Sequence, residues 1–249
     1  MNFLPVLNRL LLSQWCNNYP VMTTRILAIE TSSAACSAAL SVDGAVEERY
    51  ALAPRQHAAL ILPMIESLLA ESGSGVGELD AIAFGRGPGS FTGVRIAASI
   101  VQGIAFGADK PVIPVSTLAV LALGGLRESS GSRVMAALDA RKSEVYWGCF
   151  EKSGDTVLLR GDECVCSPAE VPLPAAVDWV AAGSGWAAYA DVLMQRLGAQ
   201  VVRVLPDLEP RAGDVARLAL GEYQYGRLLK PEEAVPVYLR DNVAEVKKS

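Results

Sequence analysis

A short apolar strand that ends in an acidic residue and a tight turn occurs twice in this chain, and this recurrence restricts the fold most. The first copy is the apolar run 26–29, which ends at Glu30, with alternating apolar residues from Cys36 onward. In the second copy the run 134–138 ends at Asp139, and alternation resumes at Val145. A continuous apolar run indicates a strand covered on both faces, and period-two alternation indicates a half-covered strand. We interpret the recurrence as an internal duplication, with chance similarity between two β-hairpins as the alternative.

Each copy continues with a glycine-containing turn and a helix. The turns are Gly85–Gly89 and Gly183–Gly185. Helical spacing of apolar residues predicts helices over 60–69, 91–108, 117–126 and 186–197. The order predicts an α/β fold of two βββαβα halves, 22–130 and 131–249, which is the actin-like ATPase (ASKHA) architecture. In that architecture an acidic residue after the first strand of each half faces a nucleotide cleft.

Composition favours a folded globular protein. The 249 residues are 51% hydrophobic and 20% charged, which excludes disorder for most of the chain. We expect no membrane-spanning helix, because the most apolar stretch, 91–106, contains Arg95 and Gln102. The net charge is −5 and the basic residues are scattered, so direct, unaided binding of nucleic acid is not expected. Residues 1–21 lack the pattern of a secretory signal, and we expect a dispensable extension before a fold that begins near Met22.

Cysteine and histidine usage argues against a metal site. Of the five cysteines, Cys164 and Cys166 are separated by one residue, unlike a zinc motif, and alternation places both on one strand face. The odd number of cysteines fits a reducing, cytoplasmic setting. His57 is the single histidine, so a paired-histidine metal site is impossible within the chain. A serine triad would have to use His57, but the chain has no Gly-x-Ser-x-Gly elbow. We therefore predict no metal ligands and no catalytic residue.

The segment GRGPGSFTG, residues 85–93, allows two interpretations. Its glycines could let a phosphate approach backbone N–H groups at a helix start, or could permit a tight strand-to-helix turn with Ser90 as the N-cap. Glu30 and Asp139 could likewise hold a nucleotide-bound magnesium through water, although turn capping is favoured. No cofactor is expected, and ATP with magnesium remains the alternative. The candidate nucleotide-facing residues are Glu30, Thr31, Gly87, Gly89 and Asp139.

Small residues recur every fourth position in the helix over 91–108. A stripe of this kind lets another helix approach closely, either from a partner subunit or within the chain's own fold. Glycine in a helix costs about 1 kcal/mol relative to alanine, so contact gains should offset it. With the neighbouring apolar helix, the candidate partner-interface residues are Leu60, Ile61, Met64, Ile65, Leu68, Ser99, Gly103 and Gly107.

Several segments together resemble the bacterial TsaB (YeaZ) family. They are ILAIETSSAACSAAL (26–40), GRGPGSFTGVRIA (85–97), PVSTLAVLA (114–122), ALDARKSEVYWG (137–148) and PVYLRDNVA (236–244). The resemblance implies an actin-like fold and a role in placing threonylcarbamoyl on the adenosine next to the tRNA anticodon. One departure is Glu30, where relatives commonly have Asp, and this weakens a nucleotide role at that loop.

The resemblance also implies how the work is divided among subunits. It implies a non-catalytic scaffold that pairs with the paralogue TsaD, which holds the metal and performs the transfer, and that is joined by the ATPase TsaE. It implies self-pairing through the same helices when TsaD is absent, and contact with tRNA only within the complex. The alternative is an actin-like-fold small-molecule kinase or ATPase using Glu30, Asp139 and the 85–93 loop. A metallopeptidase is implausible with one histidine.

Overall fold

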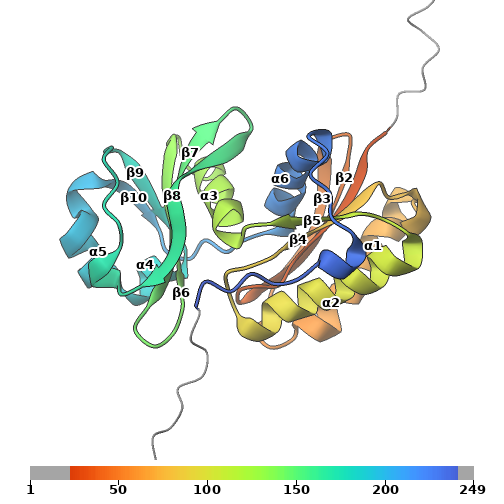
Figure 1. Ribbon diagram of the computed structural model, residues 1–249, viewed down its shortest axis with the longest axis horizontal. Helices are drawn as coiled ribbons and strands as arrows, with labels where there is room; N and C mark the ends of the chain where they lie inside the picture. Colours follow the sequence, from red (N-terminus) through yellow and green to blue (C-terminus); the bar gives the residue numbers. More distant parts are fainter. Residues whose placement is uncertain (1–22, 241–249) are drawn as a thin grey trace, which may run out of the picture.

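The computed structural model describes residues 23–240 as two mixed five-stranded β-sheets with helices on their faces (Figure 1). The strands of the first sheet are β1 (Arg25–Glu30), β2 (Ala35–Val42), β3 (Ala45–Leu52), β4 (Ala81–Gly85) and β5 (Val112–Val115). Those of the second are β6 (Arg133–Asp139), β7 (Val145–Ser153), β8 (Thr156–Cys166), β9 (Trp179–Ala182) and β10 (Val201–Leu205). The helices are α1 (His57–Ser72), α2 (Phe91–Ala108), α3 (Thr117–Arg127), α4 (Ser184–Ala188), α5 (Ala190–Leu197) and α6 (Ala212–Gln224).

The two sheets have the same strand order. The first is β3-β2-β1-β4-β5 and the second is β8-β7-β6-β9-β10. In each, the first strand pairs antiparallel with the second and parallel with the fourth. Glu30 and Asp139 end the corresponding strands β1 and β6. The duplication predicted from the sequence is therefore confirmed, and the fold is of the actin-like ATPase type.

The second half differs from the predicted βββαβα order. It has no helix between β8 and β9, where the first half has α1, and only the 3-10 turn Pro168–Glu170 occurs there. Pro168, Pro172 and Pro174 occupy this segment, and each removes a backbone donor that an α-helix would use. The helix predicted over 186–197 is also divided into α4 and α5 at Tyr189, whose φ is −131°.

Strand β1 is buried on both faces, as its continuous apolar run predicts. Leu27 and Ile29 belong to the core under α1 and α2. Ile26 and Ala28 point the other way, into a core shared with α6. Figure 1 shows α1 and α2 side by side on one face of the first sheet, with α6 on the opposite face.

Two helices pack on the sheet of the other half. α3 follows β5 in sequence, but its residues Leu118, Leu121 and Ala122 share a core with Val134 and Ala136 of β6. α6 follows β10, but it packs on β1, β2 and β4 of the first sheet. The boundary near residue 130 therefore separates the strands of the two sheets but not their helices.

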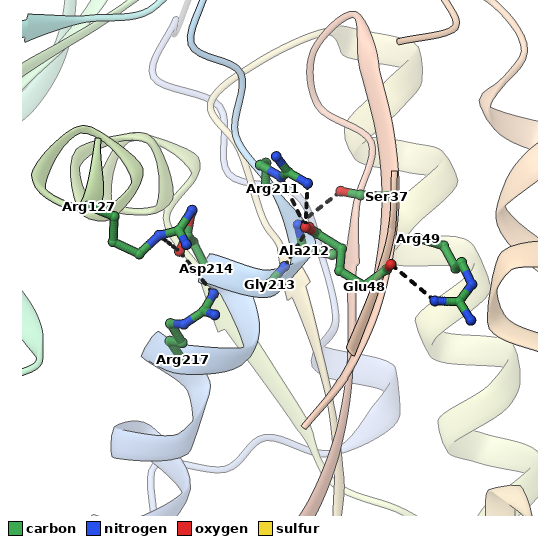
Figure 2. Close-up of polar contacts among 9 residues, drawn as sticks. All are labelled: Ser37, Glu48, Arg49, Arg127, Arg211, Ala212, Gly213, Asp214 and Arg217. Atoms are coloured by element: carbon green, nitrogen blue, oxygen red, sulfur yellow. Dashed lines mark hydrogen bonds and ion pairs between the residues drawn. The ribbon is translucent and has the colours of Figure 1, made fainter. Parts of the chain in front are cut away.

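Polar contacts fix the start of α6 on the first sheet (Figure 2). The Ser37 hydroxyl accepts a hydrogen bond of 2.9 Å from the Ala212 amide, and Glu48 Oε1 accepts one of 2.9 Å from the Gly213 amide. Arg211 also pairs with the Glu48 carboxylate at 2.7 Å. These contacts satisfy amides at the helix start, which have no partner within the helix.

Helix α2 is long and apolar enough, by length and composition alone, to cross a membrane, which the sequence analysis did not expect. Its apolar character has a cause within the fold, because Val94, Ala97, Val101 and Ala105 are buried in the chain's own core. The predicted dispensable extension, residues 1–21, lies outside the described residues.

Candidate functional site

A cleft of about 1100 Å³ lies between the two halves. Its walls come from the loops after β1 and β6, the N-terminal end of α2, the start of α4 and the chain near Tyr238. Of the five candidate nucleotide-facing residues, Gly89 and Asp139 line this cleft. Glu30, Thr31 and Gly87 are not among its lining residues.

Glu30 is fully buried and points away from the cleft. Its Oε1 accepts a hydrogen bond of 2.6 Å from the Ser32 amide, while its Oε2 has no partner. The carboxyl group lies against Gly85 of β4, where a Cβ atom would be 1.9 Å from Oε2. Burial raises the pKa of Glu30 above its ordinary value. The prediction of a nucleotide-facing Glu30 is therefore corrected, because its carboxyl group is buried against Gly85 and does not line the cleft.

The glycines of the 85–93 segment allow two loops to pack closely. Ser90 donates its amide to Ser32 O at 2.6 Å, and Thr31 Oγ1 donates to Gly93 O at 2.7 Å. A Cβ atom on Gly93 would be 1.9 Å from Thr31 O, and one on Gly89 would be 2.5 Å from Ser32 O. These distances favour the structural interpretation of the segment, with Ser90 capping α2. Thr31 is used in this packing and does not face a ligand.

The space beside Gly87 is also filled by the chain itself. Its φ is +98°, and a Cβ atom there would be 3.0 Å from Val237 O. The backbone beside it is fixed by a hydrogen bond of 2.8 Å from the Val237 amide to Arg86 O. Gly87 is thus required by the turn and by the close approach of the chain near Val237.

Asp139 does face the cleft, but its carboxylate caps a turn. Oδ1 accepts a hydrogen bond of 2.9 Å from the Arg141 amide and one of 3.1 Å from the Tyr189 hydroxyl. Oδ2 pairs with the Arg141 guanidinium at 3.0 Å. The favoured interpretation of Asp139 as a turn cap is confirmed.

The cleft also contains residues that the sequence analysis did not single out. Arg240 pairs with Glu144 and donates to Ala140 O at 3.2 Å. Glu209 has a raised pKa because it is buried. Tyr238 and Arg240 belong to the segment 236–244 that carries the family resemblance, so that segment could have indicated them. No sequence signal places Glu209 there.

His57 has a structural role. It is the first residue of α1, is 7% exposed, and its Nε2 lies 3.0 Å from Ser33 O and 3.1 Å from Ala35 O. Because both neighbours are acceptors, Nε2 is the protonated nitrogen, and the ring ties α1 to the loop after β1. Across residues 23–240, no three His, Cys, Asp or Glu side chains gather as metal ligands.

The small-residue stripe of α2 faces outward. Ser99, Gly103 and Gly107 are exposed, and a Cβ atom on either glycine would meet nothing within 4 Å. Phe106, beside the stripe, is 80% exposed. The stripe therefore does not pack on the chain's own sheet, which was one of the two interpretations of its sequence.

The apolar residues of α1 divide into two groups. Ile61, Ile65 and Leu68 are buried against the chain's own sheet, so their side chains cannot face a partner. The i, i+3, i+4 spacing that selected them is the spacing of a core face. Leu60 and Met64 are half-buried at the edge of this core. The surface of α1 and α2 that could face a partner therefore contains fewer of the predicted residues than expected.

Comparison with known proteins identifies the family. A family model described as "TsaD: tRNA N6-adenosine threonylcarbamoyltransferase" matches residues 50–248. The tRNA threonylcarbamoyladenosine biosynthesis protein TsaB of Escherichia coli (strain K12) is 43% identical, covering 88% of this chain and 96% of that protein. The chain belongs to the TsaB family. The protein of the same name from Haemophilus influenzae is 40% identical, over 88% of this chain and 94% of that protein.

A solved structure agrees with TsaB membership. YeaZ from Pseudomonas aeruginosa superposes with a TM-score of 0.82 and is 45% identical, covering 87% of this chain and all of that one. The predicted resemblance to the TsaB (YeaZ) family is thus confirmed.

Proposed function

We propose that this TsaB-family chain is an accessory, non-catalytic subunit in the synthesis of threonylcarbamoyladenosine in tRNA. The observation that carries the proposal is the outward-facing stripe of α2, Ser99, Gly103 and Gly107, on a chain of this family. Within residues 23–240 nothing packs on Gly103 or Gly107, so these glycines weaken the helix without a compensating contact there. A second helix packed on the stripe would supply the compensating contacts.

The chemistry of the cleft supports a non-catalytic role. Asp139 is engaged by Arg141 and Tyr189, and Glu30 is buried away from the cleft. His57 holds a loop. Glu30, His57 and Asp139, the titratable residues that the sequence analysis considered for chemistry, are therefore all engaged in contacts within the chain. In this proposal the transfer from threonylcarbamoyl-adenylate occurs in the partner TsaD.

The proposed pairing surface consists of Ser99, Gly103, Phe106 and Gly107 of α2 with Leu60 and Met64 of α1. Exposed Phe106 provides an apolar anchor beside a flat stripe, an arrangement typical of helix-on-helix contacts. TsaD would bind here, TsaE would join the pair, and tRNA would be contacted only within the assembled complex. A second copy of this chain would occupy the same surface when TsaD is absent. The setting would be the cytoplasm.

Gly103→Leu tests the pairing surface. The leucine side chain should block a close helix contact and abolish co-purification with co-expressed TsaD, whereas melting temperature should not fall, because the site is open. Gly221→Leu is the matched control, since Gly221 lies in α6 and also meets nothing within 4 Å. Normal TsaD binding by Gly103→Leu would show that the surface is misassigned.

Activity assays test the non-catalytic role directly. The purified chain should leave threonylcarbamoyl-adenylate and substrate tRNA unchanged, and modification should appear only after TsaD is added. Turnover by the chain alone would overturn the proposal.

An actin-like-fold small-molecule kinase or ATPase is the second candidate, favoured by the size of the cleft and by Asp139 on its wall. Isothermal titration with Mg-ATP separates the two functions. Tight, magnesium-dependent binding that Asp139→Ala weakens would favour the enzyme. The packing of Gly93 against Thr31 and of Gly89 against Ser32 argues for weak or no binding.

A further inference from the structure

Two cysteines lie in contact on the edge of the second sheet. Cys164 and Cys166 alternate along β8, so both side chains are on one face, and their sulfur atoms are 3.9 Å apart. Both residues are half-buried, in contrast to Cys149 of the neighbouring strand, which is buried. Neither the family relationship nor the proposed function gives this pair a role.

The strand that carries the pair can deform locally. Within the described residues β8 is the last strand of its sheet and pairs only with β7. Its ladder is irregular just before the pair, because Trp147 pairs with Cys164 while Cys149 pairs with Arg160. Gly161, in the extra stretch, has a φ of +79°. A bulged edge strand can shorten without breaking a second ladder.

We propose that Cys164 and Cys166 are a thiol–disulfide exchange site that closes to an intrastrand disulfide with low-molecular-weight disulfides. The Cys164 thiolate attacks one sulfur of the small disulfide, which releases one thiolate and leaves a mixed disulfide. Cys166 then loses its proton and attacks Cys164 Sγ, which releases the second thiol. Two protein thiols are oxidised and one small disulfide is reduced to two thiols.

The environment assigns different roles to the two sulfurs. The contact between the two thiols lowers the pKa of Cys164 below its ordinary value and raises the pKa of Cys166. Since the thiolate is the nucleophile, Cys164 is the attacking residue and Cys166 the resolving one. Burial raises the pKa of Cys149 to about 12, so that thiol should stay unreactive.

The closed form should be easy to reduce. Residues two apart in a regular strand have Cα atoms about 6.6–6.8 Å apart, at the upper end of the range that a disulfide spans. Closure must therefore draw Cys164 and Cys166 toward each other, a shift that the adjacent bulge can absorb, and strained disulfides are the labile ones. The pair would then respond to the ratio of small disulfide to small thiol rather than serve as a permanent crosslink.

The test treats the full-length native chain with glutathione disulfide and locates the products by mass spectrometry. Trypsin releases residues 161–196, which contain Cys164 and Cys166 and no other cysteine. The wild-type peptide should become lighter by two hydrogen atoms, and a small excess of reduced glutathione should reverse the change. Cys166→Ser should instead retain one glutathione on Cys164. Cys164→Ser should likewise stop at a single mixed disulfide, now on Cys166, because no second thiol is left to close the ring.

Two outcomes would overturn the proposal. One is a wild-type chain that ends as a mixed disulfide without closing, and the other is a native pair that does not react at all. If a serine variant fails to fold, the unmutated chain still provides a test. Iodoacetamide should label Cys164 faster than Cys166 in the native protein, and should label the two cysteines at similar rates in concentrated urea. A preference that persists in urea would contradict an origin in the fold.

Discussion

At the scale of single residues, Glu30 shows how one carboxyl group can be removed from a cleft. A shorter acidic side chain at the end of β1 would have less reach toward β4, whereas the Glu30 carboxyl lies directly against Gly85. Its Oε2 has no hydrogen-bond partner, so the ionised form is poorly compensated. Burial therefore raises the pKa of Glu30, and hydrogen bonds from Ser32 and Thr31 offset only part of this effect.

Glu30→Gln should change the pH dependence of stability. The folded pKa of Glu30 is raised, so the folded state keeps a proton that the unfolded state loses. The free energy of unfolding of the wild type should therefore fall as pH rises from the unfolded pKa, near 4.5, through the folded one. The variant lacks this contribution, and its stability relative to wild type should increase with pH.

Urea unfolding at pH 5 and pH 8 measures this effect. Glu163, Glu209 and Asp214 also have raised pKa values from burial, but they are present in both proteins and cancel in the comparison. A difference between variant and wild type that stays the same at both pH values would show that Glu30 does not titrate as described.

The sequence favoured the correct contacts for the carboxylate of Asp139, but it did not indicate where the carboxylate of Glu30 lies. Turn capping was favoured for Asp139 because no dedicated lysine or second carboxylate lies beside it in sequence, and in the structure its carboxylate accepts from the Arg141 amide. The direction of the Glu30 side chain depends on Gly85, which is far away in sequence and becomes its neighbour only through the pairing of β1 with β4. For the same reason, nothing in the sequence indicated Glu209 at the cleft.

At the scale of elements, helix α2 contains two kinds of glycine. Gly93, at its start, is required by the close approach of Thr31 O. Gly103, near its end, faces open space. The same residue type thus serves packing inside the chain at one end of the helix and leaves an open face at the other.

Gly103→Ala should raise the free energy of unfolding by about 0.5–1 kcal/mol at dilutions where the chain is monomeric, because alanine restricts the unfolded chain and meets no obstacle in the monomer. Gly93→Ala should lower it by about 1–3 kcal/mol, because the added carbon would be 1.9 Å from Thr31 O. Chemical denaturation of both variants measures the two changes in the free energy of unfolding. A loss of stability in Gly103→Ala would mean that another surface already covers the stripe.

Element prediction from the sequence succeeded where periodicity was strong. Helix α2 was predicted over its full length, and β1 and β6 were placed within one residue of their ends. Of the strands after β7 only the end of β8, at Cys164 and Cys166, was indicated, and α6 was not predicted. The strand β10 is short and largely exposed, so it lacks a clear apolar pattern. Apolar spacing located the core face of α1 and could not separate it from a partner face, so Ile61, Ile65 and Leu68 were assigned to the wrong side.

At the scale of the whole molecule, the exchange of α3 and α6 joins the two halves. Each sheet is covered by a helix that is connected in sequence to the other sheet, and the two helices also contact each other. Figure 2 shows the polar contact between them, in which Arg127 of α3 lies 2.8 Å from Asp214 of α6. Neither half keeps its full core without the other, so the chain should unfold in one cooperative step.

Asp214→Asn should lower the free energy of unfolding by less than the roughly 1.5–3 kcal/mol that a hydrogen bond to a charged group contributes, because burial raises the pKa of Asp214 and offsets part of its pairing with Arg127. The Asp214 side chain is 2% exposed and also meets Arg217 at 3.3 Å on its own helix. Arg127→Ala should cost more than Arg217→Ala, because Arg127 alone connects helices of different halves. Thermal unfolding followed by two signals measures the coupling between the two halves. Tryptophan fluorescence reports the second half through Trp147, Trp179 and Trp186, and far-ultraviolet circular dichroism reports both halves. The two signals should still change together in Asp214→Asn at a lower temperature, and two separate transitions in the wild type would contradict a shared core.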